Sequence, residues 1–248
     1  MLYGGQVHAS VAKVLTEIYR EEVLKLRGKD LGDKQSRTPE AHLVEHIVIL
    51  HLWDDAHTLD EGGLVDLLFK NAPVQLTAHA MSFMARAACR QPPLEAKVRE
   101  RMKALWEWRV RQVGGPDKMP KEELSGFGWW FACGAFDAGW AFGYLEAALK
   151  QTDIGHSRLQ VFERLNEAFA THPQESLRCL RLFIDRNEDP WFCRGGRQQK
   201  GVWALLEQAI ASSDSAIRDP AEDIVHLLGS KGYLEYRELL KTGPEGQS

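Results

Sequence analysis

Apolar residues recur at intervals of three and four along most of the chain, and a sustained interval of two, typical of strands, is almost absent. Residues three and four positions apart share one face of an α-helix, so the chain is predicted to be all-α. The predicted helices cover residues 9–26, 38–57, 64–70, 74–90, 94–113, 122–150, 158–170, 173–186, 202–211, 220–228 and 233–241. Because 122–150 is expected to hold two helices that turn near Gly134, about 10–12 helices are predicted in all.

Several predicted helix ends carry recognisable start and stop residues. Thr38 followed by Pro39 predicts a helix start, since a threonine side chain accepts a hydrogen bond from a free backbone N–H and proline suits the first helical position. Gly114, Gly115 and Pro116 predict a helix end, because glycine readily takes the left-handed conformation that ends many helices.

The last third of the chain repeats its apolar pattern with a shift of 202 − 161 = 41 residues. The shift aligns Val161 with Val202, Leu165 with Leu206, Ala168 with Ala209, Phe169 with Ile210, Ala170 with Ala211 and Ile184 with Val225. This period lies within the roughly 40 to 47 residues of HEAT or armadillo units. The chain therefore resembles HEAT-like α-helical repeat proteins, most clearly over its final third.

The HEAT-like resemblance implies a right-handed stack of antiparallel helix pairs, an α-solenoid, because one helix pair cannot cover its own apolar face. We expect residues 1–248 to form a single helical-repeat domain. Within it, residues 1–116 are expected to be less regular, 117–241 to form regular helix pairs, and 242–248 to be a disordered tail.

Composition narrows the class of protein. A formal net charge of −4 and a pI near 6.2 argue against a surface that is basic as a whole and binds nucleic acid throughout. The four cysteines have no CxxC spacing, which favours a reducing compartment. No apolar stretch approaches the ~18 residues of a membrane span, and the first residues lack a signal-peptide pattern. We expect a cytoplasmic protein that stays out of the membrane and needs no cofactor.

A segment rich in tryptophan and glycine runs from residue 127 to residue 140. Trp129, Trp130 and Trp140 could stack a base or clasp a partner's side chain, and Asp137 could stabilise a developing cation, because large aromatic faces suit such contacts. Alternatively, the glycines let two helices approach closely and the indoles fill the space between them.

This tryptophan-rich segment and the helices after it, over residues 122–240, are similar to C-terminal helical-repeat regions of prokaryotic conflict and antiphage-defence proteins. The similarity rests on the Gly-Trp-Trp-Phe cluster, the Phe136-Asp137 step and Trp140. It implies a sensor or assembly surface for another protein, and the chain carries no GxxxxGK[ST] loop. The HEAT-like DNA glycosylases are a rival resemblance, in which Trp129, Trp130 and Asp137 would take the roles of their tryptophans and aspartate.

His42, Glu45 and His46 match the H-x-x-E-H pattern of the inverzincin metallopeptidases. On a helix the two histidines lie one turn apart and could share a Zn²⁺, with Glu45 as general base and Glu122 or Glu123 as third ligand. Those enzymes resemble mixed α/β folds, however, whereas this chain predicts helices throughout. The alternative is an ordinary helix face with solvated or hydrogen-bonded histidines.

Arg194, Arg197 and Lys200 place three cations in a stretch just before a predicted helix. Phosphate or nucleic acid could bind there, at the helix N-terminus, although basic surface loops often have no such role. Because the sequence shows no complete catalytic set, the function predicted is an interaction scaffold or adaptor for another protein, as in the sensor or assembly part of a defence system. A DNA-binding protein or glycosylase and a zinc metallopeptidase are the alternatives.

Overall fold

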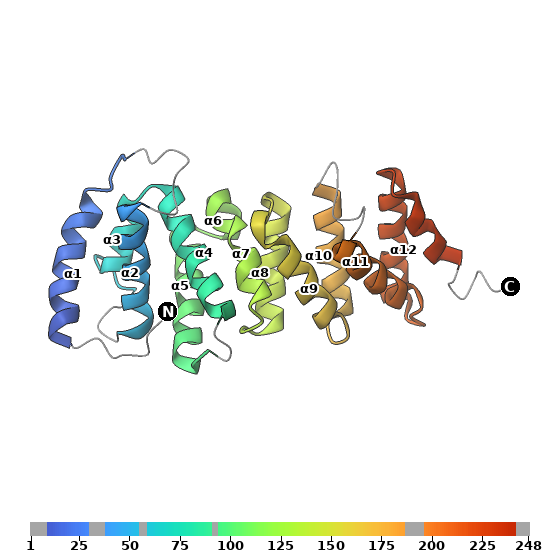
Figure 1. Ribbon diagram of the computed structural model, residues 1–248, viewed down its shortest axis with the longest axis horizontal. Coiled ribbons are helices and arrows are strands. Elements are labelled where there is room, and N and C mark those ends of the chain that lie inside the picture. The colour runs from blue at the N-terminus through green and yellow to red at the C-terminus, as the bar shows by residue number, and fades with distance from the viewer. Residues whose placement is uncertain (1–8, 30–37, 55–58, 91–93, 187–195, 242–248) are drawn as a thin grey trace. The chain divides into compact units, whose positions relative to one another are not determined.

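The computed structural model describes residues 9–29, 38–54, 59–90, 94–186 and 196–241, which form helices and no strand (Figure 1). The predicted all-α class is confirmed. The described residues contain twelve α-helices: α1 (Ala9–Leu24), α2 (Pro39–Trp53), α3 (Leu64–Asn71), α4 (Val74–Arg90), α5 (Ala96–Val113), α6 (Lys121–Ser125), α7 (Phe127–Ala132), α8 (Ala138–Gln151), α9 (Arg158–Phe169), α10 (Pro173–Arg186), α11 (Gly196–Ile210) and α12 (Ser215–Ser230). Three short 3-10 helices, η2 (Pro116–Lys118), η3 (Gly155–Ser157) and η5 (Leu234–Lys241), accompany them. No helix in this described part is both long and apolar enough to cross a membrane.

The chain divides into two compact units, Met1–Phe136 and Asp137–Ser248. The division falls inside the tryptophan-rich segment, so Trp129 and Trp130 belong to the first unit and Trp140 to the second. The expected single domain over 1–248 stays a prediction, and the expected tail, 242–248, lies outside the described residues.

The core of the first unit is built around α4, which packs against α2, α6 and α7. Trp106 from α5 and Trp130 from α7 are both wholly buried there, with ring centroids 5.3 Å apart. The indole N–H of Trp130 donates a hydrogen bond to the carbonyl of Met81 at 3.0 Å, which satisfies a polar group that burial would otherwise leave unpaired. Aromatic packing thus joins α5 and α7, and the hydrogen bond of Trp130 joins α7 to α4.

In the second unit, α10 packs between α8 and α12, while α11 contacts α9, α12 and η5. Two positively charged side chains bond to backbone carbonyls near the ends of neighbouring helices. Arg186 of α10 donates to the carbonyl of Lys150 at 3.0 Å, near the end of α8, and Lys231 donates to the carbonyl of Asp185 at 3.2 Å, near the end of α10. A positive side chain beside the last carbonyls of a helix stabilises that end.

The two predicted helix signals are confirmed. The hydroxyl of Thr38 accepts a hydrogen bond from the N–H of Ala41 at 3.2 Å, and Pro39 is the first residue of α2. At the end of α5, Gly114 has a φ of +83°, in the left-handed region where an L side chain is strained. Both ends are therefore set by local chemistry.

Two predicted helix starts and the predicted number of helices in 122–150 were wrong. Helix α12 begins at Ser215 rather than Pro220, because Asp214 caps it by accepting from the N–H of Ala216 at 2.9 Å. Pro220 lies inside the helix, where a proline costs roughly 3 kcal/mol, and the buried face that includes Ile224 offsets this cost. Helix α11 starts six residues early, at Gly196. The segment 122–150 holds α6, α7 and α8 instead of two helices.

Gly126, at the junction of α6 and α7, lies close to α4. A Cβ on Gly126 would lie 2.7 Å from the hydroxyl oxygen of Ser82 on α4, which is closer than atoms of this kind approach. A side chain at position 126 would therefore require the Ser82 hydroxyl or α4 to move.

Candidate functional site

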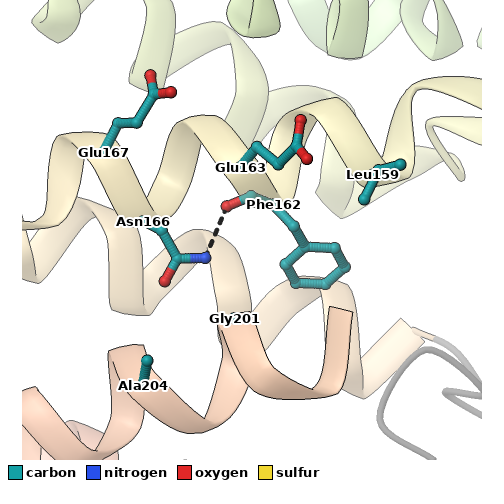
Figure 2. Close-up of a pocket in the computed structure, with 7 residues that line it drawn as sticks. All are labelled: Leu159, Phe162, Glu163, Asn166, Glu167, Gly201 and Ala204. Carbon is teal, nitrogen blue, oxygen red and sulfur yellow. Dashed lines mark hydrogen bonds between the residues drawn. The ribbon is translucent and has the colours of Figure 1, made fainter. Parts of the chain in front are cut away.

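A groove opens between α9 and α11 in the second unit and has a volume of about 420 Å³ (Figure 2). The lining residues are Leu159, Phe162, Glu163, Asn166, Glu167, Gly201 and Ala204. Pockets that hold ligands usually measure roughly 300–1,000 Å³, so this groove is large enough for a side chain or a small molecule.

Helix α9 supplies one wall because its lining residues recur every three or four positions. Leu159, Glu163 and Asn166 share one face of the helix for that reason. The Nδ2 of Asn166 donates to the carbonyl of Phe162 at 2.9 Å, which fixes the amide against its own helix. Figure 2 shows its Oδ1 pointing toward α11, where it can accept a hydrogen bond from an occupant.

Helix α11 supplies the opposite wall with two small residues, Gly201 and Ala204. A Cβ built on Gly201 would lie 3.0 Å from the Nδ2 of Asn166, so a larger residue there would require the amide to shift by a few tenths of an ångström. Ala204 is exposed and adds only a methyl group. The groove exists because α11 has short side chains opposite the longer ones of α9.

The groove combines an apolar floor with an acidic rim. Phe162 is only 3% exposed and packs edge-on against Phe183 of α10, with ring centroids 4.8 Å apart. Glu163 and Glu167 stand on the rim, and Glu167 pairs with Arg164 at 3.1 Å. The polar groups among the seven lining residues are these two carboxylates and the amide of Asn166.

The structure separates the predicted tryptophan site into different environments. Trp130 lies in the core with 0% exposure, whereas Trp129 is partly exposed on α7. Asp137 is the N-cap of α8 and accepts a hydrogen bond from the backbone N–H of Trp140 at 2.9 Å. Trp140 packs edge-on against Tyr144, with ring centroids 5.1 Å apart. Packing and capping thus account for Trp130 and Asp137, and binding by the four residues stays a prediction.

The basic stretch is mostly helical in the part that the structure describes. Arg194 lies outside the described residues, as does the side chain of Arg197. Lys200 is exposed on α11, one residue before Gly201 of the groove. Because α11 starts at Gly196, Arg197 and Lys200 belong to the helix itself. The prediction that they lie in a loop before a helix starting at Val202 was wrong.

The H-x-x-E-H residues lie on α2, and each has a protein partner. Glu45 contacts the Nε2 of His79 at 2.8 Å and the Nδ1 of His42 at 3.3 Å. The Nδ1 of His46 lies 3.1 Å from the hydroxyl of Tyr19.

Of the two third ligands considered for a zinc ion, Glu123 is wholly buried against Arg109, at 2.8 Å, and Glu122 is exposed. Across the described residues, no group of three His, Cys, Asp or Glu side chains could hold a metal ion.

The groove residues did not stand out in the sequence, although one signal for them existed. Under the 41-residue shift, Gly201 and Ala204 occupy the positions of Gln160 and Glu163. Where α9 has two long side chains, α11 has two small residues at the corresponding positions, and such a difference opens space between packed helices.

No family model, curated protein or solved structure matches the chain. The HEAT-like and defence-protein resemblances therefore stay predictions, as do the glycosylase and metallopeptidase alternatives.

Proposed function

We propose that this protein is an interaction module that docks a segment of another protein in the groove between α9 and α11. The observation that carries the proposal is the groove itself, an open space of about 420 Å³ with a phenyl floor from Phe162 and an acidic rim. Interfaces commonly place an apolar centre inside a polar rim, and this groove offers both on a small scale.

The second unit belongs, in this proposal, to a HEAT-like stack of helix pairs. Shifted by 41 residues, α9 covers 199–210 and α10 covers 214–227. The end of α9 then coincides with the end of α11 and the start of α10 lies one residue from the start of α12, while the other two ends differ by three residues. The buried pair Val161 and Leu165 falls on the buried pair Val202 and Leu206. Matching helix bounds and matching burial support a repeated structural unit, and stacked units provide extended surfaces for partners.

The experiment fills the groove without disturbing the core. Ala204→Leu adds bulk at an exposed position of the groove wall, and Ala104→Leu makes the same change at an exposed position of α5 in the first unit. Tagged forms of both variants and the unaltered protein are used to capture partners from the native host, with quantitative mass spectrometry. We expect Ala204→Leu to lose a partner that Ala104→Leu retains, at unchanged melting temperature. Equal capture by all three forms would rule out the groove as the docking site.

A further inference from the structure

Helix α1 carries an apolar stripe that is open to solvent. Val11, Val14 and Ile18 recur at intervals of three and four residues, so they share one side of the helix, and each is at least 50% exposed. Together with Leu24 they make up four of the five exposed large apolar side chains in the described part of the chain. Single exposed apolar residues are ordinary, whereas a group of them on one face marks an interaction surface.

The opposite side of α1 attaches the helix to the first unit. Val23 follows Val14 by about two and a half helical turns, which places it on the far side, and it is wholly buried. The hydroxyl of Tyr19 lies 3.1 Å from the Nδ1 of His46 on α2. Helix α1 thus packs against α2 and α3 through this side (Figure 1). The stripe is therefore available to a partner while α1 stays packed.

Carboxylates border the stripe on one side. At about 100° per residue, Glu17 and Glu21 lie within about 60° of Val14 around the helix, whereas the cations Lys13 and Arg20 lie about 100° and 120° away. Both glutamates are exposed, and within the described part of the chain neither belongs to an ion pair. The margin of the stripe is therefore acidic.

The other margin adds no net positive charge. Glu22 lies beside Ile18, one turn further along the helix, and forms an ion pair with Lys25 at 2.6 Å. Lys25 continues the line of the stripe beyond the end of α1, so its charge is offset by this pair. The carboxylates of Glu17 and Glu21 are left to determine which partners the stripe attracts.

We infer that the stripe docks a basic amphipathic helix of another protein, at a surface separate from the groove between α9 and α11. A partner helix presents apolar anchors at the same intervals of three and four residues as the stripe. Lysine or arginine beside those anchors would lie across the contact from Glu17 and Glu21. Opposite charges that flank an apolar seam select the partner and speed its approach.

A second copy of the chain fits this surface less well. Stable interfaces bury about 800 Å² on each partner, from 20–30 residues, whereas the stripe provides three apolar anchors, which suits a single helix. Two copies would also bring Glu17 and Glu21 of both chains to one contact, where like charges repel. The same carboxylates disfavour an anionic membrane, because helices that lie on such membranes carry lysine and arginine beside their apolar face.

The test uses two synthetic helical peptides that share one stripe of leucines and differ only beside it, where one carries lysine and the other glutamate. Each peptide is labelled with a fluorophore and titrated with the full chain, and binding is followed by fluorescence anisotropy. We expect saturable binding of the lysine peptide and at least about fivefold weaker binding of the glutamate peptide, because the two carboxylates attract one and repel the other. The preference should shrink as salt is added, since exposed charges are screened.

One pair of variants tests the apolar stripe. Val14→Gln combined with Ile18→Gln should abolish binding of the lysine peptide. Leu234→Gln, which removes a 56% exposed leucine from η5 in the second unit, should leave binding intact. Because these side chains are exposed, the melting temperature of each variant should match that of the unaltered protein.

A second pair of variants tests the charges. Glu17→Gln combined with Glu21→Gln should retain binding of both peptides and remove the preference for lysine. Glu235→Gln combined with Glu238→Gln makes the same change at exposed positions of η5 and should leave the preference unchanged.

Equal binding of the two peptides to the unaltered protein, or binding of neither, would overturn this inference. A lysine peptide that Ala204→Leu displaces would overturn it too, because the peptide would then lie in the groove between α9 and α11. So would a dimer, detected by light scattering, that Val14→Gln with Ile18→Gln abolishes, or binding to phosphatidylserine vesicles in place of the peptide. The proposed function at the groove fails separately, when Ala204→Leu captures the same partners as the unaltered protein.

Discussion

The guanidinium of Arg109 on α5 donates two hydrogen bonds to the carboxylate of Glu123 on α6, at 2.8 and 2.9 Å. The Glu123 side chain is wholly buried, and the hydroxyl of Thr77 on α4 donates to the same carboxylate at 2.6 Å. Arg109 also lies over the ring of Phe69, with its Cζ 5.0 Å from the ring centroid. One buried carboxylate therefore connects three helices of the first unit.

Removing the charge of Glu123 should strongly destabilise the protein. Glu123→Gln leaves the guanidinium of Arg109, which is only 14% exposed, without a counter-charge, and breaking a buried pair in this way costs about 3–5 kcal/mol. The free energy of unfolding, measured by urea denaturation, should fall by that amount. In the combined variant Glu123→Leu with Arg109→Met, no buried charge remains, so much of the loss should be recovered. A loss below about 1 kcal/mol in Glu123→Gln would contradict this account.

Asp66 should make the stability depend on pH in the acid range. Burial by itself would raise the pKa of Asp66, but the ion pair with Lys70 at 2.8 Å and the N–H of Gly62 at 2.8 Å outweigh burial and hold the pKa below its usual value. A lowered pKa in the folded state stabilises the protein above the unfolded pKa, and this contribution disappears as the pH falls through the folded value.

We therefore expect Asp66→Asn to cost about 1–2 kcal/mol near pH 7 and to differ little from the unaltered protein well below pH 4, roughly the unfolded pKa. Urea denaturation across this pH range provides the measurement. Glu61→Gln, at a side chain that is 94% exposed, is the control and should change the stability by less than about 0.5 kcal/mol at either pH. A constant difference between Asp66→Asn and the unaltered protein at all pH values would refute the electrostatic explanation.

Gly201 and Asn166 should be energetically coupled. Replacing a glycine inside a helix by alanine normally stabilises by about 1 kcal/mol, but a Cβ at position 201 would lie 3.0 Å from the Nδ2 of Asn166. We expect Gly201→Ala to yield less than this gain, and to yield the full gain when Asn166 is also changed to alanine. A double-mutant cycle of unfolding free energies measures the coupling, and strict additivity would show that the two residues do not interfere.

Two valines at helical positions should differ sharply in their effect on stability. Val44 of α2 is 0% exposed, whereas Val14 of α1 is 57% exposed and lies on the same face of its helix as the half-exposed Val11 and Ile18. Val44→Ala should cost about 1–3 kcal/mol through lost burial and an incompletely filled cavity. Val14→Ala should stay within about 0.5 kcal/mol, as measured by thermal unfolding. Similar losses in the two variants would mean that Val14 is covered in solution.

Local chemistry in the sequence determined most of the helices and some of their ends. The bounds of α10, Pro173–Arg186, agree with the prediction. Thr38 marks the start of α2 and Gly114 the end of α5, each through contacts within a few residues. Such signals act over one helical turn, so a single sequence contains all that is needed to predict them. The helix start predicted at Pro220 was wrong because packing along the whole buried face of α12 outweighed the preference of proline for the first turn of a helix.

Tertiary structure alone decided what the individual side chains do. Trp130 and Glu123 look like functional residues in the sequence, yet one fills the core and the other is neutralised by Arg109. Gly201 and Ala204, by contrast, are inconspicuous in the sequence and form the wall of the groove. Burial, pairing and open space depend on which helices meet and at what distance, and that follows from packing between residues far apart in the chain.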